Sequence, residues 1–252
     1  MTTESEYTNP GRKLLRTILQ ALTVPALGAL TRLEITGLEN LPKSGPLMVV
    51  GNHFSFIDPV CLVRLSPWQI EFLGGANMPH APLWSKVIPV LWGYHPLYRG
   101  TGAADSLKAA VAILNRGGVM GIFPEAGNWA TVLRPARPGA AFIAVQSGAP
   151  LLPVGLVAMY EVFPSLSRGR RAKIQINIGK PFGPFKASGH GRERRTQLDE
   201  IGHEIMRHIA ELIPPEKRGH YSDDPAIREA AKGTEIYPWA DKVEGEVVGE
   251  VR

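Results

Sequence analysis

Three strand-length apolar runs, at residues 47–51, 119–124 and 149–157, limit most strongly what this chain can fold into. The runs contain no charged side chain, which is typical of strands that are buried on both faces. Helical spacing of apolar residues separates the runs, as in residues 58–65 and 103–116. Buried strands that alternate with helices at this spacing predict an α/β fold with a largely parallel, mixed sheet flanked by helices.

Polar side chains that carry chemistry follow two of these runs. Asn52-His53 comes directly after the first run, and Glu125 comes shortly after the second. The carboxyl ends of parallel strands meet at one edge of a sheet, where the ligand sites of α/β proteins form. We therefore expect the segments around His53 and Glu125 to contribute to one site.

His53 and Asp58 are five residues apart. On a regular helix they would be about 140° apart and could not pair. If His53 lies on a turn and Asp58 in the first turn of a helix, the chain folds back and the two can meet. The carboxylate would then fix the imidazole tautomer and leave the other ring nitrogen free to take a proton. The alternative is that Asp58 is a simple helix cap and His53 an ordinary turn residue.

The N-terminal region, residues 14–33, is the most apolar stretch of the chain, but polar residues and Pro25 interrupt it. It has fewer than the roughly 18 to 20 consecutive apolar residues that a spanning helix needs. Arg12, Lys13 and Arg16 lie at its start, and leucines recur at helical spacing. This pattern predicts an amphipathic helix that lies in a membrane interface, although a helix packed on the domain would look similar.

The 28 Lys and Arg outnumber the 23 Asp and Glu, and the net charge of +5 favours an anionic partner. A phospholipid surface, an acyl carrier and the phosphates of a coenzyme are the candidates. We do not expect nucleic acid, because no motif for it is present. The single cysteine, Cys61, excludes an internal disulfide and a zinc site of several cysteines, and its apolar neighbours predict a buried thiol.

Four segments occur in a fixed order along the chain. They are NHFSFIDP from residue 52, YRG from residue 98, FPEAG from residue 123 and LLPVG from residue 151. In this order they resemble the four blocks of the glycerolipid acyltransferases, the lysophosphatidic acid acyltransferase family, over roughly residues 35–180. The first block is the most specific, because it matches the pattern Asn-His-x-Ser-x-x-Asp-Pro. The resemblance implies transfer of an acyl group from acyl-CoA or acyl carrier protein to a lysophospholipid hydroxyl, with lysophosphatidic acid as the leading acceptor.

The resemblance also implies roles for individual residues. His53 would be the general base, Asp58 its orienting partner, and Arg99 a ligand of the acceptor phosphate. The other residues implied to bind substrate are Asn52, Ser55, Phe123, Pro124, Glu125, Ala126, Gly127 and Asn128. No metal or cofactor is expected beyond the acyl donor as co-substrate.

The third block departs from the family, which usually has Phe-Pro-Glu-Gly, then Thr or Gly, then Arg. Asn128 stands where that Arg is expected, and a neutral amide cannot match the charged fork that binds phosphate. Arg134 and Arg137 are close enough in sequence to supply the missing cation. Alternatively, the acceptor is another lysolipid or a hydroxyl compound without phosphate, and the two arginines are surface residues.

The expected chemistry needs few groups, because a thioester carbonyl is already activated towards attack. The oxyanion would need backbone N–H donors, for which residues 54–56 and 126–128 are candidates. Ser55 lacks the Gly-x-Ser-x-Gly setting of a serine hydrolase. Two further hypotheses are an acyl thioesterase and a lipid-binding protein without catalysis.

Three parts of the chain are expected from its composition. Residues 1–34 would form an N-terminal tail and the interface helix, residues 35–213 the acyltransferase domain, and residues 214–252 a loosely ordered tail. The N-terminus lacks the basic region of a secretory signal. We therefore expect the protein on the cytoplasmic face of the membrane, held peripherally or monotopically.

Overall fold

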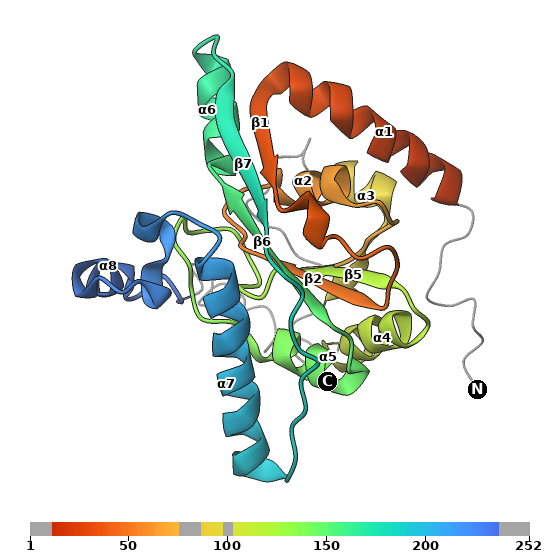
Figure 1. Ribbon diagram of the computed structural model, residues 1–252, viewed down its shortest axis with the longest axis vertical. Coiled ribbons are helices and arrows are strands. Elements are labelled where there is room, and N and C mark those ends of the chain that lie inside the picture. Colours follow the sequence, from red (N-terminus) through yellow and green to blue (C-terminus); the bar gives the residue numbers. More distant parts are fainter. Residues whose placement is uncertain (1–11, 76–86, 98–102, 237–252) are drawn as a thin grey trace, which may run out of the picture.

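The computed structural model describes residues 12–75, 87–97 and 103–236. Its centre is a seven-stranded sheet in the order β1-β7-β6-β2-β5-β3-β4 (Figure 1). The strands are β1 (Thr31–Thr36), β2 (Leu47–Gly51), β3 (Glu71–Gly75), β4 (His95–Leu97), β5 (Val119–Ile122), β6 (Leu151–Val157) and β7 (Ala172–Ile178). Neighbouring strands are parallel except β6 and β7, which are antiparallel. The predicted α/β fold with a largely parallel, mixed sheet is confirmed.

Helices cover both faces of the sheet. They are α1 (Lys13–Leu30), α2 (Asp58–Leu65), α3 (Val87–Trp92), α4 (Ala103–Asn115), α5 (Pro138–Ser147), α6 (Val162–Ser167), α7 (Gly191–Ala210) and α8 (Pro225–Ala231). Short 3₁₀ turns are η3 (Leu38–Asn40), η5 (Met159–Glu161), η6 (Pro215–Lys217) and η7 (Gly219–Tyr221). One apolar core lies between the sheet and α2, and a second lies between the sheet and α4, α5 and α7. Because both faces are covered, β2 and β5 are buried along their whole length.

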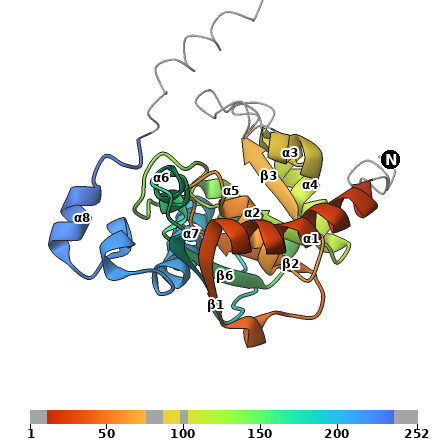
Figure 2. The same ribbon diagram turned by 90° about the horizontal axis from the view of Figure 1, so that it is seen from above.

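Helix α1 is continuous through Pro25 and packs against α2 (Figure 2). Its length and composition, with a mean hydropathy of 1.2, are sufficient for a membrane-crossing helix. The basic residues at the start of α1 were expected to face a membrane interface. Two of them, Arg12 and Arg16, instead bond other parts of the protein. Arg16 is 4% exposed, pairs with Glu71 and donates to the carbonyl of Trp92, while Arg12 donates to the carbonyl of Val90.

The outward side of α1 is apolar. Its large exposed side chains are Leu14, Leu15, Ile18, Leu22, Val24 and Leu30. The adjacent helix α3 adds Val87, Val90 and Leu91, which are also exposed. We call these nine residues the apolar patch.

The predicted C-terminal tail, residues 214–252, is described as far as residue 236. This part, residues 214–236, is here called the C-terminal segment and is packed on the domain. It contains η6, η7 and α8. The backbone of Leu133 donates to the carbonyl of Lys217 and accepts from the N–H of His220. Gly219 comes so close to Leu133 that a Cβ would lie 2.3 Å from its carbonyl oxygen. Composition did not reveal this docking, because it depends on backbone contacts between distant residues.

Candidate active site

Strands β2 and β5 are parallel neighbours, with Val50 opposite Ile122. The segments that follow them therefore leave the sheet side by side at the same edge (Figure 1). The rings of His53 and Phe123 stack there, with centroids 4.3 Å apart and planes inclined by 21°. The two segments therefore lie together at this edge, as the parallel sheet led us to expect.

His53 and Asp58 face each other. Nδ1 of His53 lies 2.9 Å from Oδ2 of Asp58. The same oxygen accepts the backbone N–H groups of Phe54 and Ser55, each at 2.7 Å. The carboxylate does not cap α2, because the N-cap is Ile57 and Asp58 accepts the N–H groups of Phe54 and Ser55, which precede the helix. The geometry is therefore the predicted folded-back pair rather than a simple helix cap.

Asp58 is fully buried, and this burial raises the pKa of its carboxyl, although hydrogen bonds from His53, Ser55 and Phe54 act in the opposite direction. His53 keeps 18% of its side chain exposed. Because Nδ1–H donates to the carboxylate, Nε2 is the ring nitrogen that can accept a proton. No group in the described part of the chain bonds Nε2. The pair is thus arranged to take a proton from an incoming group.

Glu125 belongs to the third block, and its carboxylate bonds the backbone of His53. Its Oε1 accepts the backbone N–H of His53 at 2.8 Å, and its Oε2 accepts Nε of Arg134 at 3.0 Å. Both side chains are buried. Burial raises the pKa of Glu125 to about 7, against the opposing effect of Arg134. Burial also lowers the pKa of Arg134. Sequence reasoning missed this ion pair, for which no local pattern gives a signal.

Arg134 does not face a substrate. Its side chain is 1% exposed, its guanidinium lies 3.9 Å from the ring of Trp129, and Nη2 donates to the carbonyl of Gly127. We expected Arg134 to supply a cation for phosphate, and this expectation must be corrected. Its charge instead balances Glu125 inside the protein.

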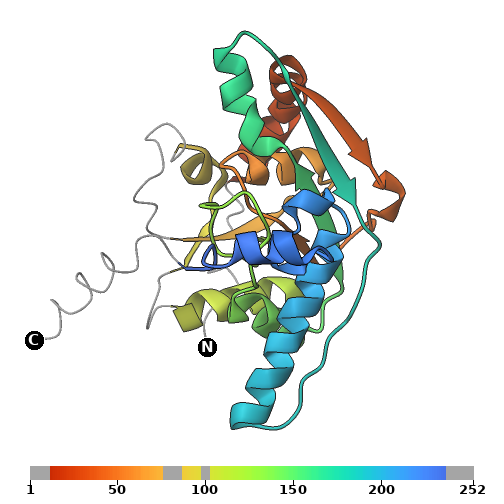
Figure 3. The same cartoon turned by 90° about the vertical axis from the view of Figure 1, so that its left-hand side faces the viewer.

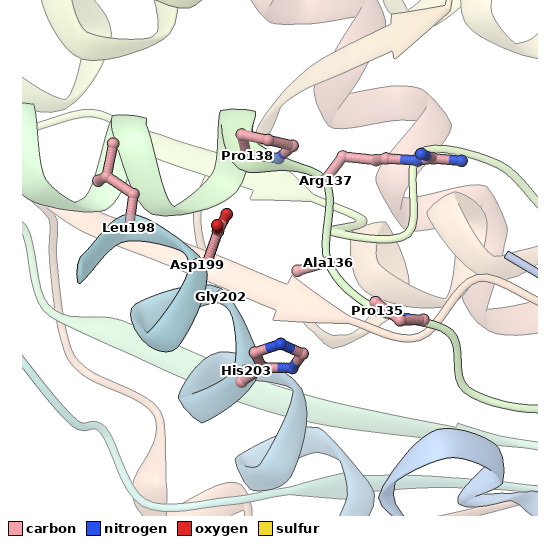
Figure 4. A pocket seen from close by; sticks show the side chains of 8 residues that line it. All are labelled: Pro135, Ala136, Arg137, Pro138, Leu198, Asp199, Gly202 and His203. Atoms are coloured by element: carbon pink, nitrogen blue, oxygen red, sulfur yellow. The ribbon is translucent and has the colours of Figure 1, made fainter. Parts of the chain in front are cut away.

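Arg137 is exposed, and its guanidinium bonds the C-terminal segment. Its Nη2 donates to the carbonyl of Glu235 at 2.8 Å. It borders a shallow hollow against α7, from which its side chain extends away (Figure 4). Residues 135–138 line this hollow together with Leu198, Asp199, Gly202 and His203. Nothing in this geometry brings Arg137 to the imidazole of His53.

Asn52 and Ser55 also point into the protein. Asn52 is fully buried, and its amide donates to the carbonyl of Leu156 and accepts the N–H of the same residue. It therefore joins the end of β2 to β6, and the expected substrate contact must be corrected. The hydroxyl of Ser55 is buried and accepts the N–H of Ile57, which is unlike an exposed nucleophile.

The remaining predicted residues form the turn after β5. Pro124 is buried, and its carbonyl accepts the N–H of Arg137. Ala126 is exposed and has a positive φ of 58°, a conformation that favours glycine. Gly127 and Asn128 are half-exposed. Arg99 lies outside the described residues.

Two other sequence predictions concern metal and thiol chemistry. Within the described ranges no group of three His, Cys, Asp or Glu side chains could hold a metal ion. Cys61 is fully buried, and burial raises the pKa of its thiol well above the ordinary value. The prediction of a buried thiol is confirmed.

Together, the fold and the site define a class of protein. It is an α/β protein whose sheet edge presents an imidazole oriented by a buried carboxylate, without the elbow of a serine hydrolase. The chain belongs to the acyltransferase family, whose model matches residues 32–157.

Its relatives include curated 1-acyl-sn-glycerol-3-phosphate acyltransferases. The chloroplastic enzyme BAT2 of Brassica napus is 30% identical over 173 residues, which cover 66% of this chain and 50% of that protein. The enzyme of Borreliella burgdorferi is 26% identical over 66% of this chain and 68% of its own length. The chain spans about half the length of the plant relatives it matches.

A solved structure supports the fold. The crystal structure of the 1-acyl-sn-glycerophosphate acyltransferase PlsC from Thermotoga maritima superposes with a TM-score of 0.55. The match covers 81% of this chain and 82% of that one, at 22% sequence identity. At this identity the likeness concerns the architecture alone.

Proposed function

We propose that this protein transfers a fatty acyl group from acyl-CoA or acyl carrier protein to the hydroxyl of a lysophospholipid. The observation that carries the proposal is the contact between Nδ1 of His53 and the buried Asp58, which leaves Nε2 able to accept a proton. Such a pair has the geometry that general-base catalysis requires.

In the proposed reaction, Nε2 of His53 takes the proton of the acceptor hydroxyl as its oxygen attacks the thioester carbonyl. Asp58 stabilises the imidazolium that forms and holds its orientation. The tetrahedral intermediate then expels the thiolate as the C–S bond breaks, and the imidazolium returns the proton to the leaving sulfur. The ester and the free thiol leave, and the site is regenerated without a metal or a covalent enzyme intermediate.

Hydrogen bonding narrows the candidates for stabilising the oxyanion. The N–H groups of Phe54 and Ser55 already bind Asp58, and that of Ala126 binds the carbonyl of Phe123. Of the six amides expected from the sequence, those of Phe56, Gly127 and Asn128 have no partner within the described residues. We propose that the oxyanion is bound among these three.

Lysophosphatidic acid is the leading acceptor, because the curated relatives are named for acylation of 1-acyl-sn-glycerol-3-phosphate. A second candidate is another lysolipid, or a hydroxyl acceptor without a phosphomonoester. Burial of Arg134 in its ion pair with Glu125, together with the neutral Asn128, favours this second candidate. Replacing Arg99 by Ala separates the two, because only a phosphate acceptor should then bind much more weakly.

We further propose that the protein acts on the cytoplasmic face of a membrane. The apolar patch of α1 and α3 supports attachment to a membrane, because it would be costly to leave in water and suits the lipid interface. The net charge of +5 would add attraction to anionic lipid.

The test is an assay with labelled acyl-CoA, with and without a panel of lysolipids, in which every labelled product is identified. The wild type should acylate a lysolipid, and His53→Ala should lose that activity by at least about 100-fold. His190→Ala, at an exposed residue before α7, is the matched control and should retain it.

Two results would overturn the proposal. Free fatty acid as the main product without an acceptor would indicate a thioesterase. Wild-type transfer by His53→Ala would remove the mechanism.

A further inference from the structure

The C-terminal segment, residues 214–236, lies against the turn and loop that follow β5, residues 123–137 (Figure 3). We call the latter the 123–137 loop. Besides the backbone pairing at Leu133, two side chains of the loop bind the end of the segment. The indole N–H of Trp129 donates to the carbonyl of Thr234 at 2.8 Å, and Arg137 donates to the carbonyl of Glu235 at 2.8 Å.

Trp129 links this docking to the site through direct contacts. One face of its ring lies 3.9 Å from the guanidinium of Arg134. Arg134 binds Oε2 of Glu125 at 3.0 Å, and Oε1 of Glu125 holds the backbone N–H of His53 at 2.8 Å. An uninterrupted series of contacts therefore runs from Thr234 to His53.

This series reaches the acceptor side of the site. Gly127 and Asn128 lie between the two anchored points of the loop, Glu125 and Trp129, and both are half-exposed. Gly127 also receives a hydrogen bond from Arg134 at its carbonyl. The family model ends at residue 157, so the C-terminal segment lies outside the matched region.

We propose that the C-terminal segment is a clamp that positions the 123–137 loop for the acyl acceptor, with Trp129 as the positioning residue. The inference rests on the proposed acyl transfer. With the clamp closed, Gly127 and Asn128 are ordered before the acceptor arrives, so binding does not have to order them. Without it, the acceptor must fix the loop as it binds, while ground-state binding of the donor is unaffected, because the oxyanion forms only during the reaction.

The test uses full-length protein with labelled acyl-CoA and lysophosphatidic acid. Trp129→Phe keeps an aromatic ring over Arg134 but removes the N–H that binds Thr234. It should raise the acceptor KM about five- to tenfold, the effect of losing one partly buried hydrogen bond, and leave the acyl-CoA KM unchanged. Hydrogen exchange of backbone amides in residues 126–134 should become faster in the same variant.

A second substitution disturbs the same docking from within the C-terminal segment, at Gly219. Gly219→Ala places a Cβ against the backbone of Leu133, whereas Gly169→Ala, also at positive φ, meets open space and is the matched control. If Gly219→Ala and Trp129→Phe release the same docking, the double variant should raise the acceptor KM no more than about tenfold, because the effects are not additive. If each variant alone raises the acceptor KM at least about fivefold, independent effects would multiply to at least about 25-fold.

The outcomes are separable. Unchanged acceptor KM and unchanged exchange in Trp129→Phe would overturn the clamp. Equal rises in the acceptor KM and the donor KM would show that Trp129 has only a general structural role, and would overturn the clamp. Multiplication of the effects of Trp129→Phe and Gly219→Ala on the acceptor KM would overturn it as well. A wild type without any transfer activity would overturn the proposed function instead. Hydrogen exchange would then still decide whether the segment orders the loop.

Discussion

The two halves of the site are built in different ways. In the turn after β2, Asp58 gathers His53, Phe54 and Ser55, all within five residues along the chain. In the 123–137 loop the corresponding carboxylate, Glu125, binds a backbone 72 residues away. The same loop is held to the C-terminal segment across 105 residues.

This difference separates proton transfer from acceptor selection. The bonds that hold the imidazole and carboxylate together lie within one short turn. The loop is held by distant segments and touches that turn through Glu125 and Phe123, so residues 126–128 can change while these two contacts remain. The departures from the usual family pattern, Ala126 and Asn128, lie in the loop and not in the turn.

The largest expected effect is at the self-contained turn. Asp58→Asn removes the charge that orients and supports the imidazole, so kcat/KM should fall about 100- to 10,000-fold. Single-turnover acyl transfer measures the loss, and circular dichroism checks that the variant folds. Asp105→Asn, whose side chain is 87% exposed, is the control and should match the wild type. Transfer within threefold of the wild type in Asp58→Asn would mean that the turn is only structural.

The next largest expected effect is on the pH dependence of stability, and it comes from Glu125 in the 123–137 loop. Burial raises the pKa of Glu125 from 4.5 to about 7, so the folded protein binds more protons than the unfolded chain in this range. The contribution of Glu125 to stability is therefore greatest below pH 4.5 and is lost as the pH rises through about 7. From pH 4.5 to 8, the free energy of unfolding should fall by up to about 3 kcal/mol more in the wild type than in Glu125→Gln.

Denaturant unfolding at several pH values measures this difference. Glu216→Gln, at an exposed carboxylate, should follow the wild-type curve. Parallel pH curves for the wild type and Glu125→Gln would contradict the prediction and show that Arg134 keeps Glu125 ionised throughout.

The sequence predicted what depends on local pattern. The buried strands, the helix that begins at Asp58 and the meeting of His53 with Asp58 all follow from residues near one another. The parallel sheet then places Glu125 at the same edge, because β2 and β5 are neighbours. In these cases periodicity and strand direction fix where a side chain goes.

The sequence could not predict what depends on distant partners. Arg134 is a buried ion pair rather than a free cation because Glu125 and Trp129 enclose it. Arg12 and Arg16 turn inward because carbonyls at the end of α3 accept their N–H groups. The polar composition of residues 214–236 concealed backbone pairing with Leu133. A charged side chain in a sequence does not reveal whether it meets water or a partner.

The third prediction compares one asparagine from each half of the site. Asn52 lies beside the turn after β2, and Asn128 lies in the 123–137 loop. Asn52→Ala leaves the backbone N–H and carbonyl of Leu156 unpaired in the interior, so the free energy of unfolding should fall by about 2 kcal/mol. The acceptor KM should stay near the wild-type value. Asn128→Ala, in the half-exposed loop, should do the reverse and change the acceptor KM without lowering stability. A raised acceptor KM in a folded Asn52→Ala variant would contradict this division.

The smallest expected effect is at Ala126, which has a positive φ of 58° where the family pattern has glycine. Glycine relieves the backbone strain but gains entropy in the unfolded chain, so Ala126→Gly should stabilise the protein by at most about 1 kcal/mol. Ala158, with a φ of 61°, has the same backbone conformation outside the loop, and Ala158→Gly is therefore the matched control. Thermal unfolding should shift similarly in both variants. Only Ala126→Gly should alter the acceptor KM, because the freedom it adds lies between Glu125 and the exposed amides of the loop. Equal kinetics in the two variants would show that the loop is held firmly enough by Glu125 and Trp129 to tolerate a flexible residue between them.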